Sequence, residues 1–494
     1  MTGSPKTALR SLHAVFFAVA ALAMVNALLF AASTANWLPT ADNWFYLDRI
    51  VYPYAHGQFD PNSLLVKRSA FDHSQPLRRL LLLANYEWFD LDFRVEAIFA
   101  VLAGIANFLL IGFCVRRELS RGMPVSGLAF AVLGAIYFSL SATVVFTWSL
   151  LTLSFTSQFF ILLWMLASWG VLEKPALSRI VLLIASTFAM GLISDDTSLV
   201  AVIAGAMASL IHAGRSHAKR AAILQVAASA IGLGLYLGFY HAVAPAVPSA
   251  GAGRLMSAQG LFSSIGDVLP WGAAVPFSSA IVHRGLLRTW FGGSTEAIVL
   301  LMAAGFVVAH AWFWKQAIVG DRNRTAFMAT VFMLLFYGLV AAIIIGRVSR
   351  FGADYLWQPR YAIVYRWHVV ALLLMVLAQS QRIVRSPGTR RTALALLSIP
   401  LLAQLPIGMA AWNSAKYIRA TGMRMADQIV EMGGSAEALP SRACASQLTV
   451  CKFDDARRER LVAFLRDQHL SVFSGEVRER NGYRPRRGGS GTQR

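Results

Sequence analysis

The chain has 494 residues, of which 56% are hydrophobic and 14% are charged, and its formal net charge is +20. Soluble domains carry roughly 25% charged residues, so this composition excludes an ordinary soluble protein and points to lipid. The positive charge does not indicate a nucleic-acid partner, because most of it lies in short connections between apolar segments. We therefore expect an all-α polytopic membrane protein.

Apolar runs long enough to cross a hydrocarbon core of ~30 Å recur along the chain. The first, Ser11 to Ser33, is too long for the apolar part of a signal peptide and lacks a clear cleavage site. We expect it to be retained as the first membrane span. About eleven spans are predicted in all: 12–33, 96–115, 124–146, 151–172, 178–194, 197–213, 220–242, 297–314, 325–346, 361–380 and 392–411.

The connections between these spans differ in charge on the two sides. On one side, basic residues greatly outnumber the acidic residues Glu118, Glu173 and Asp321. Since Lys and Arg accumulate in cytoplasmic loops, this side is expected to be the cytoplasmic one. The N-terminus then lies in the cytoplasm, and an odd number of spans places the C-terminus outside.

Two connections on the expected outer side are long. The first, 36–96, is rich in Asp and aromatic residues, and the second, 244–296, is rich in Gly, Pro and Ser. Pro270 and Pro276 interrupt the apolar patches of the second connection. This pattern predicts short helices that lie in the membrane interface or dip back, and not another crossing. The transmembrane domain is expected to extend over 1–411.

The chain becomes mixed and water-soluble after residue 411. We expect a small C-terminal domain over 412–475, with helices at Ala415–Met432 and Asp455–Gln468 and a short strand at Leu470–Phe473.

Two features of this C-terminal region bear on its compartment and its order. Cys444 and Cys451 can form a disulfide only if the region faces an oxidising compartment. The last residues, 476–494, are rich in Arg and Gly and are expected to be a disordered basic tail.

Several acidic residues on the outer side are candidates for chemistry. Asp42 follows the first span in the sequence TADNW, where a carboxylate can deprotonate an acceptor hydroxyl or bind a divalent cation. The alternative is a solvated Asp beside Trp44 at the membrane interface. Asp195 and Asp196 form a near-minimal turn, where adjacent acids need a cation or a basic partner. A divalent cation, Mg²⁺ or Mn²⁺, held together with Asp42 is one interpretation, and a plain polar turn is the other.

Two groups of basic residues are candidates for binding an anion. Arg78 and Arg79 follow Pro76 at the expected start of a helix, where they can bind a phosphate or a sugar carboxylate. A surface helix whose arginines face lipid headgroups is the alternative.

The second basic group lies in the outer loop GRVSRFGADYLWQPRY, which contains Arg347, Arg350, Arg360 and Tyr361. Three arginines on the expected outer face run against the charge bias, as a functional anion would require. They can clamp a lipid-linked phosphate at headgroup depth, or bind ordinary phospholipid headgroups.

This layout resembles the GT-C superfamily of integral-membrane glycosyltransferases, which take a sugar from a polyprenyl-phosphate carrier. Three stretches resemble a bacterial group in that superfamily: ADNW at 41–44, with Asn43 at the group's second acid, GRVSRFGADYLWQPRYAIVYRW at 346–367 and RLVAFLRDQHLSVF at 460–473. A His-x-Glu-His-Arg cluster that is frequent in the group's first loop is altered here to His-Ser-Gln-Pro-Leu at 73–77.

The resemblance implies a glycosyltransferase of the bacterial inner membrane that acts on its outer face. Asp42 would be the catalytic or metal-binding acid, and Arg347 and Arg360 would face the carrier phosphate. The partners implied are a polyprenyl-phosphate-linked sugar donor, a glycan, lipid or protein acceptor, and membrane lipid. The alternatives are a transporter or flippase for a lipid-linked or anionic solute, and a non-catalytic scaffold of an envelope polysaccharide complex.

Overall fold

The computed structural model describes residues 5–67, 73–214, 219–244, 268, 270–348, 351–434 and 444–485. Within these residues the chain forms helices and their connections, without a strand. Nine of the described helices are long and apolar enough to cross a membrane, and Val125–Tyr137 and Thr197–Ala213 are apolar but shorter. The prediction of an all-α, multi-pass membrane protein is therefore confirmed, whereas the count of eleven spans stays a prediction.

The helices fall into two groups by length. The long ones are α1 (Pro5–Thr34), α5 (Phe93–Arg121), α9 (Ser154–Glu173), α10 (Leu177–Ser194), α11 (Asp196–Ala213), α12 (Lys219–Val243), α16 (Thr295–Val319), α17 (Arg324–Ile343), α19 (Ala362–Ala378) and α21 (Pro387–Gly434). The short ones are α2 (Asn43–Tyr46), α3 (Tyr52–Ala55), α4 (Pro76–Phe89), α6 (Val125–Tyr137), α7 (Val144–Thr147), α8 (Ser149–Thr152), α14 (Trp271–Ser279), α15 (Arg284–Phe291), α20 (Ser380–Arg385), α22 (Asp455–Asp467) and α23 (Gly475–Arg480).

The long helices form a bundle whose inside and outside are both apolar. Helix α19 packs against α17 and α6, and nearly all of its side chains are buried. The outer helices expose large apolar side chains, such as Leu22 on α1, Ile231 on α12 and Leu301 on α16. In water such surfaces drive aggregation, so the outside of the bundle is suited to lipid.

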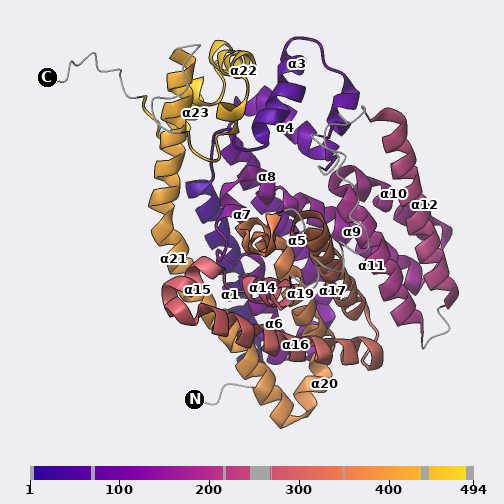
Figure 1. The fold of residues 1–494 in the computed structure, drawn as a ribbon. Helices are drawn as coiled ribbons and strands as arrows, with labels where there is room; N and C mark the ends of the chain where they lie inside the picture. The colour runs from indigo at the N-terminus through magenta and orange to yellow at the C-terminus, as the bar shows by residue number, and fades with distance from the viewer. Residues whose placement is uncertain are drawn as a thin grey trace.

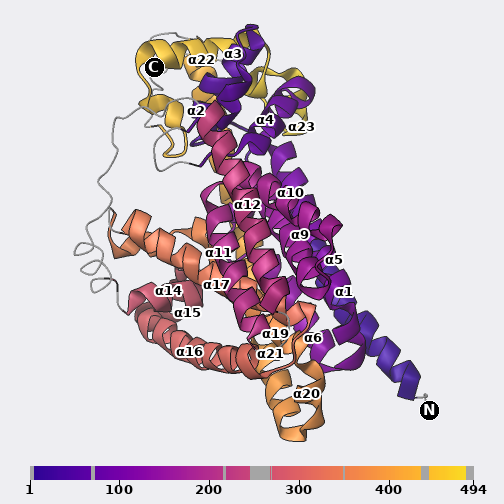
Figure 2. The same cartoon turned by 90° about the vertical axis from the view of Figure 1, so that its right-hand side faces the viewer.

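The first long connection and the C-terminal region form one unit at one end of the bundle, which we call the cap (36–92, 423–434 and 444–485). Figures 1 and 2 show α2, α3 and α4 beside α22 and α23, whereas α1 begins at the opposite end. The two regions share an apolar core that includes Trp44, Ile50, Leu83, Ile429, Leu461 and Phe464. Helix α21 runs without a break from the bundle into the cap, so the boundary expected at residue 412 lies inside a helix.

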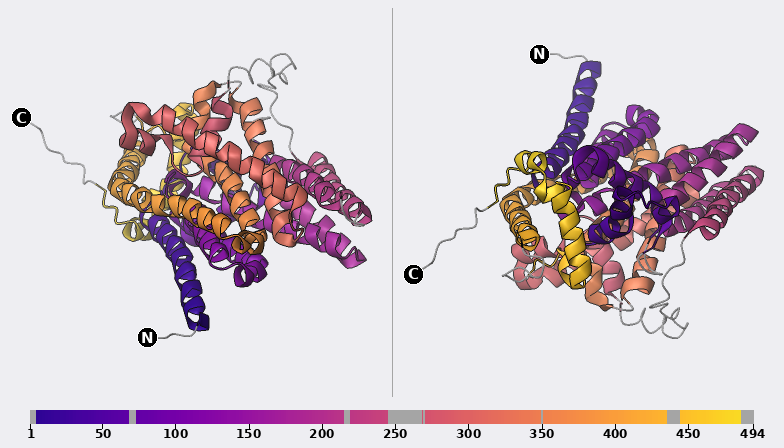
Figure 3. Two further views of the ribbon diagram at one scale, coloured as in Figure 1. Left: turned by 90° about the horizontal axis from the view of Figure 1, so that it is seen from below. Right: turned by 90° about the horizontal axis from the view of Figure 1, so that it is seen from above.

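The described residues of the second long connection include short helices, and their position at the membrane interface stays a prediction. Residues 245–267 and 269 lie outside the described residues, and α14 and α15 follow them. Helix α14 is buried and packs against α16 and α19. Helix α16 runs across the bundle at a steep angle to α17 and α19, as Figures 1, 2 and 3 all show.

Two predictions for the C-terminal region are wrong. Leu470–Phe473 does not form a strand, because Ser471 adopts a φ of +50° and its N–H donates to the Asp90 carbonyl at 2.6 Å, so the chain turns. The disordered tail does not begin at residue 476, because Gly475–Arg480 forms helix α23 with Val477 buried. Residues 486–494 lie outside the described residues.

Candidate functional site

Asp42 lies where the first long connection meets the C-terminal part of the cap. The preceding residue, Ala41, has a φ of +46°, which residues other than glycine rarely adopt. The Ala41 N–H donates to the Gln447 carbonyl at 2.8 Å, and the Phe45 N–H donates to the Asp42 carbonyl at 3.0 Å. Asp42 itself is half-buried. The position of this carboxylate therefore depends on a contact with the far end of the chain.

Gln447 lies in a loop closed by a disulfide between Cys444 and Cys451. Within the same loop, the Ala445 N–H donates to Gln428 Oε1 on α21 at 3.1 Å. The disulfide loop is thus fixed to α21 on one side and to Ala41 on the other. A disulfide in the cap suits an oxidising compartment.

Replacing Cys444 and Cys451 together with Ser is expected to loosen the backbone at Ala41. A disulfide that closes so short a loop contributes about 2 kcal/mol in the chain-entropy account. Amide hydrogen exchange at Ala41 should accelerate by roughly tenfold or more, since about 1.4 kcal/mol corresponds to a factor of ten. The matched control is Cys114→Ser, which changes a buried free cysteine of α5. Unchanged exchange at Ala41 in the double variant would contradict the positioning role of the loop.

Arg78 and Arg79 lie at a small cavity of about 20 Å³, together with Asn43 and Glu96. Glu96 Oε1 accepts a hydrogen bond from Asn85 Nδ2 at 2.8 Å. The buried Nδ2 of Asn43 and Nε of Arg78 have no hydrogen-bond partner among the described residues. A cavity of this size holds one water molecule. Such a water would accept hydrogen bonds from these donors and donate one to the Glu96 carboxylate.

The two arginines differ in what they bind. Arg79 is buried and donates to the carbonyls of Leu64 and His73, so it holds the first long connection together. Arg78 donates to the Leu150 carbonyl at 3.1 Å and to Ser154 Oγ at 3.3 Å. Burial lowers the pKa of the Arg78 guanidinium to about 10. Of the two arginines, Arg78 is therefore the one whose Nε–H can donate to a water in the small cavity.

Glu96 is a site residue that the sequence interpretation missed. It is buried in the first turn of α5, close enough to Arg78 for their charges to attract. A signal was present, since a carboxylate at the start of an apolar span is costly without a partner. The position of that partner became visible only when α4 was placed against α5.

Asp195 is separate from Asp42 and binds three groups of its own. Its carboxylate accepts hydrogen bonds from the Ser74 N–H at 2.8 Å and from the Tyr236 hydroxyl at 2.7 Å, and Lys67 Nζ lies 2.7 Å from it. Lys67 is thus the basic partner that the acidic turn requires. The side chain of Asp196 lies outside the described part of the structure, and no group of three or more His, Cys, Asp or Glu side chains that could hold a metal occurs within that part.

The arginine loop connects α17 to α19. Arg360 stacks on the rings of Tyr355 and Tyr361, at 5.1 and 5.4 Å from their centres, and donates to the Tyr355 hydroxyl. Arg347 and Arg360 both lie within electrostatic range of the Tyr361 hydroxyl. Arg350 lies outside the described residues. The turn Pro359–Tyr361 packs against α7, which connects this loop to the end of α1.

His283 fastens α15 to the arginine loop through its neutral form. Its Nε2 lies 3.0 Å from the Trp357 carbonyl, and its Nδ1 accepts from the Gly285 N–H at 3.2 Å. One ring nitrogen must therefore donate and the other must accept, which only the neutral ring can do. Burial lowers the pKa of His283.

Acidification is expected to open the first turn of α15. Because the pKa of His283 is lower in the folded protein, its contribution to stability is complete above the unfolded pKa of about 6.5 and is lost as the pH falls through the folded value. Exchange at the Gly285 amide, corrected for its intrinsic pH dependence, should accelerate between pH 7.5 and about 4. His283→Asn keeps a helix cap without a titrating ring. If the same acceleration persists in that variant, His283 is not its cause.

A larger cavity of about 660 Å³ is lined in part by the segment that precedes Asp42. Its walls come from the end of α1, from α7, α21 and α23, and from the segment Asn36–Thr40 that leads to Asp42. Neither Asp42 nor Arg360 is among the described residues that line it. Cavities of roughly 300–1,000 Å³ are the usual size of small-molecule sites.

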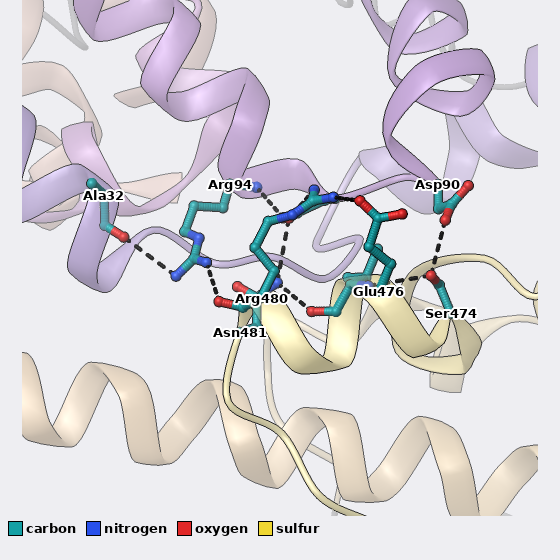
Figure 4. Close-up of polar contacts among 9 residues, drawn as sticks. Ala32, Asp90, Arg94, Ser474, Glu476, Arg480 and Asn481 are labelled. Carbon is teal, nitrogen blue, oxygen red and sulfur yellow. Dashed lines mark hydrogen bonds and ion pairs between the residues drawn. The ribbon is translucent and has the colours of Figure 1, made fainter.

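One wall of the large cavity is built by a polar contact between α5 and α23, shown in Figure 4. Arg480 Nη1 lies 3.0 Å from the fully buried carboxylate of Asp92, and Arg480 also pairs with Glu476. Ser474 Oγ donates to Asp90 at 2.9 Å. Burial raises the pKa of Asp92, against the opposing effects of Arg94 and Arg480. These contacts fix the C-terminal part of the cap to the start of α5.

Comparison of the chain with protein-family models, with curated proteins and with solved structures gives no match.

Proposed function

We propose that the protein is a membrane glycosyltransferase that moves a sugar from a polyprenyl-phosphate-linked donor to an envelope glycan, lipid or protein acceptor at the outer face of the bacterial inner membrane. The observation that supports this best is the large cavity at the junction of the bundle and the cap, whose wall Asn36–Thr40 leads directly to Asp42. Transfer from a lipid-linked donor needs a polar cavity at such a junction, because the donor's tail stays in the bilayer and the acceptor must reach the donor's headgroup there.

In this reaction Asp42 takes the proton of the acceptor hydroxyl as that oxygen attacks the anomeric carbon of the sugar. The bond between the sugar and the phosphate oxygen breaks with inversion, and polyprenyl phosphate leaves. Arg347 and Arg360 neutralise the departing phosphate, as guanidinium groups do through charge-assisted hydrogen bonds. Loss of a general base lowers a rate by about 10²–10⁴-fold, so this is the contribution to the transfer rate expected of Asp42.

A divalent cation does not fit Asp195 as the structure has it. Lys67 and Tyr236 already occupy the carboxylate, so Mg²⁺ or Mn²⁺ would have to displace a cation at 2.7 Å. No step of the transfer proposed above involves a metal at Asp195. Membrane lipid remains a partner, since the outer helices expose apolar side chains.

The proposed orientation has eleven spans, a cytoplasmic N-terminus and an extracytoplasmic cap. Helix α1 begins at the end of the bundle where α20 lies, and α20 carries Arg382 and Arg385 (Figures 1 and 2). Basic residues at that end and a disulfide at the other support cytoplasmic and outer faces respectively.

Transport of a lipid-linked or anionic solute is the second candidate, and one feature favours it. Inside the bundle, His310 Nε2 lies 3.1 Å from His368 Nδ1, and His310 Nδ1 lies 2.7 Å from the Tyr337 hydroxyl. Ionisable residues at membrane depth are typical of transport pathways. The altered cluster at 73–77 leaves a third candidate, a non-catalytic scaffold of an envelope polysaccharide complex.

The proposal is tested with the purified full-length protein in lipid vesicles, supplied with a panel of polyprenyl-phosphate sugars. A transferase releases polyprenyl phosphate and forms a new glycosidic product. Movement of the intact lipid between leaflets without any product indicates the transporter. Neither product nor movement with any member of the panel indicates the scaffold.

A further inference from the structure

Two guanidinium groups in the lining of the large cavity have no carboxylate hydrogen-bond partner within the described residues. Arg94 donates to the carbonyls of Ala32 at 3.3 Å and Arg480 at 2.6 Å, and Arg419 Nε donates to the Ser33 carbonyl at 2.7 Å. The Asp92 carboxylate attracts the charge of Arg94, whereas Arg480 and Arg419 repel it. In the described lining, Glu479 is the one carboxylate. An anion would relieve this repulsion.

The rest of the lining also favours a ligand rich in acceptor oxygens. The Nε1 of Trp148 is buried and has no hydrogen-bond partner among the residues that the structure describes. Hydroxyl and amide side chains also line the cavity, among them Thr34, Asn36, Thr40, Thr143, Thr147 and Asn481. Asp92 and Glu476 pair directly with Arg480, and Asp92 also offsets part of the charge of Arg94. The charge available to a ligand therefore comes chiefly from Arg419, whose Nε donates only to a backbone carbonyl among the described residues.

The end of α1 indicates where the cavity lies along the bundle. Ser33 and Thr34, the last residues of this apolar helix, form part of the lining. The cavity thus begins where α1 leaves the apolar part of the bundle, which is the depth of lipid headgroups. Helix α7 contributes Val144 and Thr147 to the lining, and it also packs against the turn that carries Arg360. The cavity and the arginine loop are therefore two sites that both contact α7.

We infer that the large cavity binds the acceptor, and that the acceptor carries an anionic group, a phosphate or a carboxylate, on a sugar at headgroup depth. This inference rests on the proposed function, in which Asp42 meets the acceptor hydroxyl and the arginine loop meets the donor phosphate. The anionic sugar has two sources, a lipid-attached headgroup and a water-soluble glycan.

The inference is tested by equilibrium binding to the purified full-length protein. The soluble probe is trigalacturonate, with maltotriose as its neutral match. The lipid probe is glucuronosyl diacylglycerol in phosphatidylcholine nanodiscs, with glucosyl diacylglycerol as its neutral match. Wild-type protein should bind one of the anionic probes at least about tenfold more tightly than its match, since a charge-assisted hydrogen bond contributes roughly 1.5–3 kcal/mol. Binding of trigalacturonate alone identifies a soluble glycan, and binding of glucuronosyl diacylglycerol identifies a lipid headgroup.

Substitutions on α21 separate charge from packing. Arg419→Gln should lower the affinity for the anionic probe about tenfold or more, whereas Arg419→Lys should retain most of that affinity. Arg424→Gln changes an exposed arginine of α21 that does not line the cavity and should have no effect. Gly422→Leu should block the probes, because the nearest atom to an added Cβ, Asn36 Oδ1, is 4.0 Å away and the side chain has room to fill the cavity.

Equal affinity of wild-type protein for the anionic and neutral probes would overturn the inference, and so would equal affinity of wild type and Arg419→Gln. Because these binding measurements need no catalysis, the inference about the acceptor and the proposed glycosyltransferase function can be refuted independently. Glycosyl transfer without anion preference removes only the inference about the acceptor. If the protein binds the anion at Arg419 but forms no product, only the proposed glycosyltransferase function is refuted.

Discussion

Asp42→Asn is expected to lower glycosyl transfer by ~10²–10⁴-fold, the usual contribution of a general base. The amide has the shape of the carboxylate but cannot accept the acceptor's proton. Folding should be unaffected, because the Ala41–Gln447 contact uses backbone atoms and Asn is tolerated before a helix as well as Asp is. The rate is measured as polyprenyl phosphate released by purified protein in vesicles.

The matched control is Asp60→Asn. Asp60 lies in the same connection and accepts from the Asn62 N–H at 2.9 Å, which an Asn side chain can also do. It lines neither cavity in the described structure. This variant should transfer at the wild-type rate. Full activity of Asp42→Asn would remove Asp42 from the mechanism.

Asp195→Ala is expected to lower the free energy of unfolding by about 3–5 kcal/mol, the range for breaking a buried ion pair. The change takes the carboxylate away from the largely buried Lys67 ammonium, and it removes the acceptor of the hydrogen bonds that the Ser74 N–H and the Tyr236 hydroxyl donate. Lys67 and Ser74 both belong to the first long connection, so this part of the cap should detach first. Equilibrium unfolding in detergent and hydrogen exchange at Ser74 measure the two effects.

A double-mutant cycle distinguishes the lysine from a metal as the partner of Asp195. Lys67→Met combined with Asp195→Asn should be less destabilising than the sum of the two single changes, because neither variant group is then a buried unpaired charge. Chelation of Mg²⁺ and Mn²⁺ should leave the wild-type stability unchanged. Additive single effects together with a loss of stability on chelation would show that Asp195 holds a metal.

The helices were predictable from the sequence, whereas the cap was not. Hydropathy marks helices such as α5 and α19, because lipid requires long apolar helices whatever their neighbours are. The cap depends on contacts between distant parts of the chain, such as Asp48 with Arg457 at 2.7 Å. Nothing local to either residue indicates the other. The same reason explains Leu470–Phe473, where the apolar pattern suits a strand but Asp90 turns the chain.

The candidate site was predictable to a similar extent. The charge bias predicts that Asp42, Arg78 and Arg360 lie in connections on one side of the membrane, and this stays a prediction. Their grouping did not follow, since Arg78 faces Glu96 across a small cavity while Arg360 lies with Tyr355 beside α7. Partners on separate helices become visible only when those helices are packed together.

The central claim is that transfer takes place on the side of the membrane that carries the cap. It is tested most directly in vesicles of known orientation, with the cap located by its accessibility to added protease and with a membrane-impermeant acceptor supplied on one side at a time. We expect product only when the acceptor is on the side of the cap, and none with Asp42→Asn. Product formed only when the acceptor faces the start of α1, or movement of the lipid without product, would contradict the account.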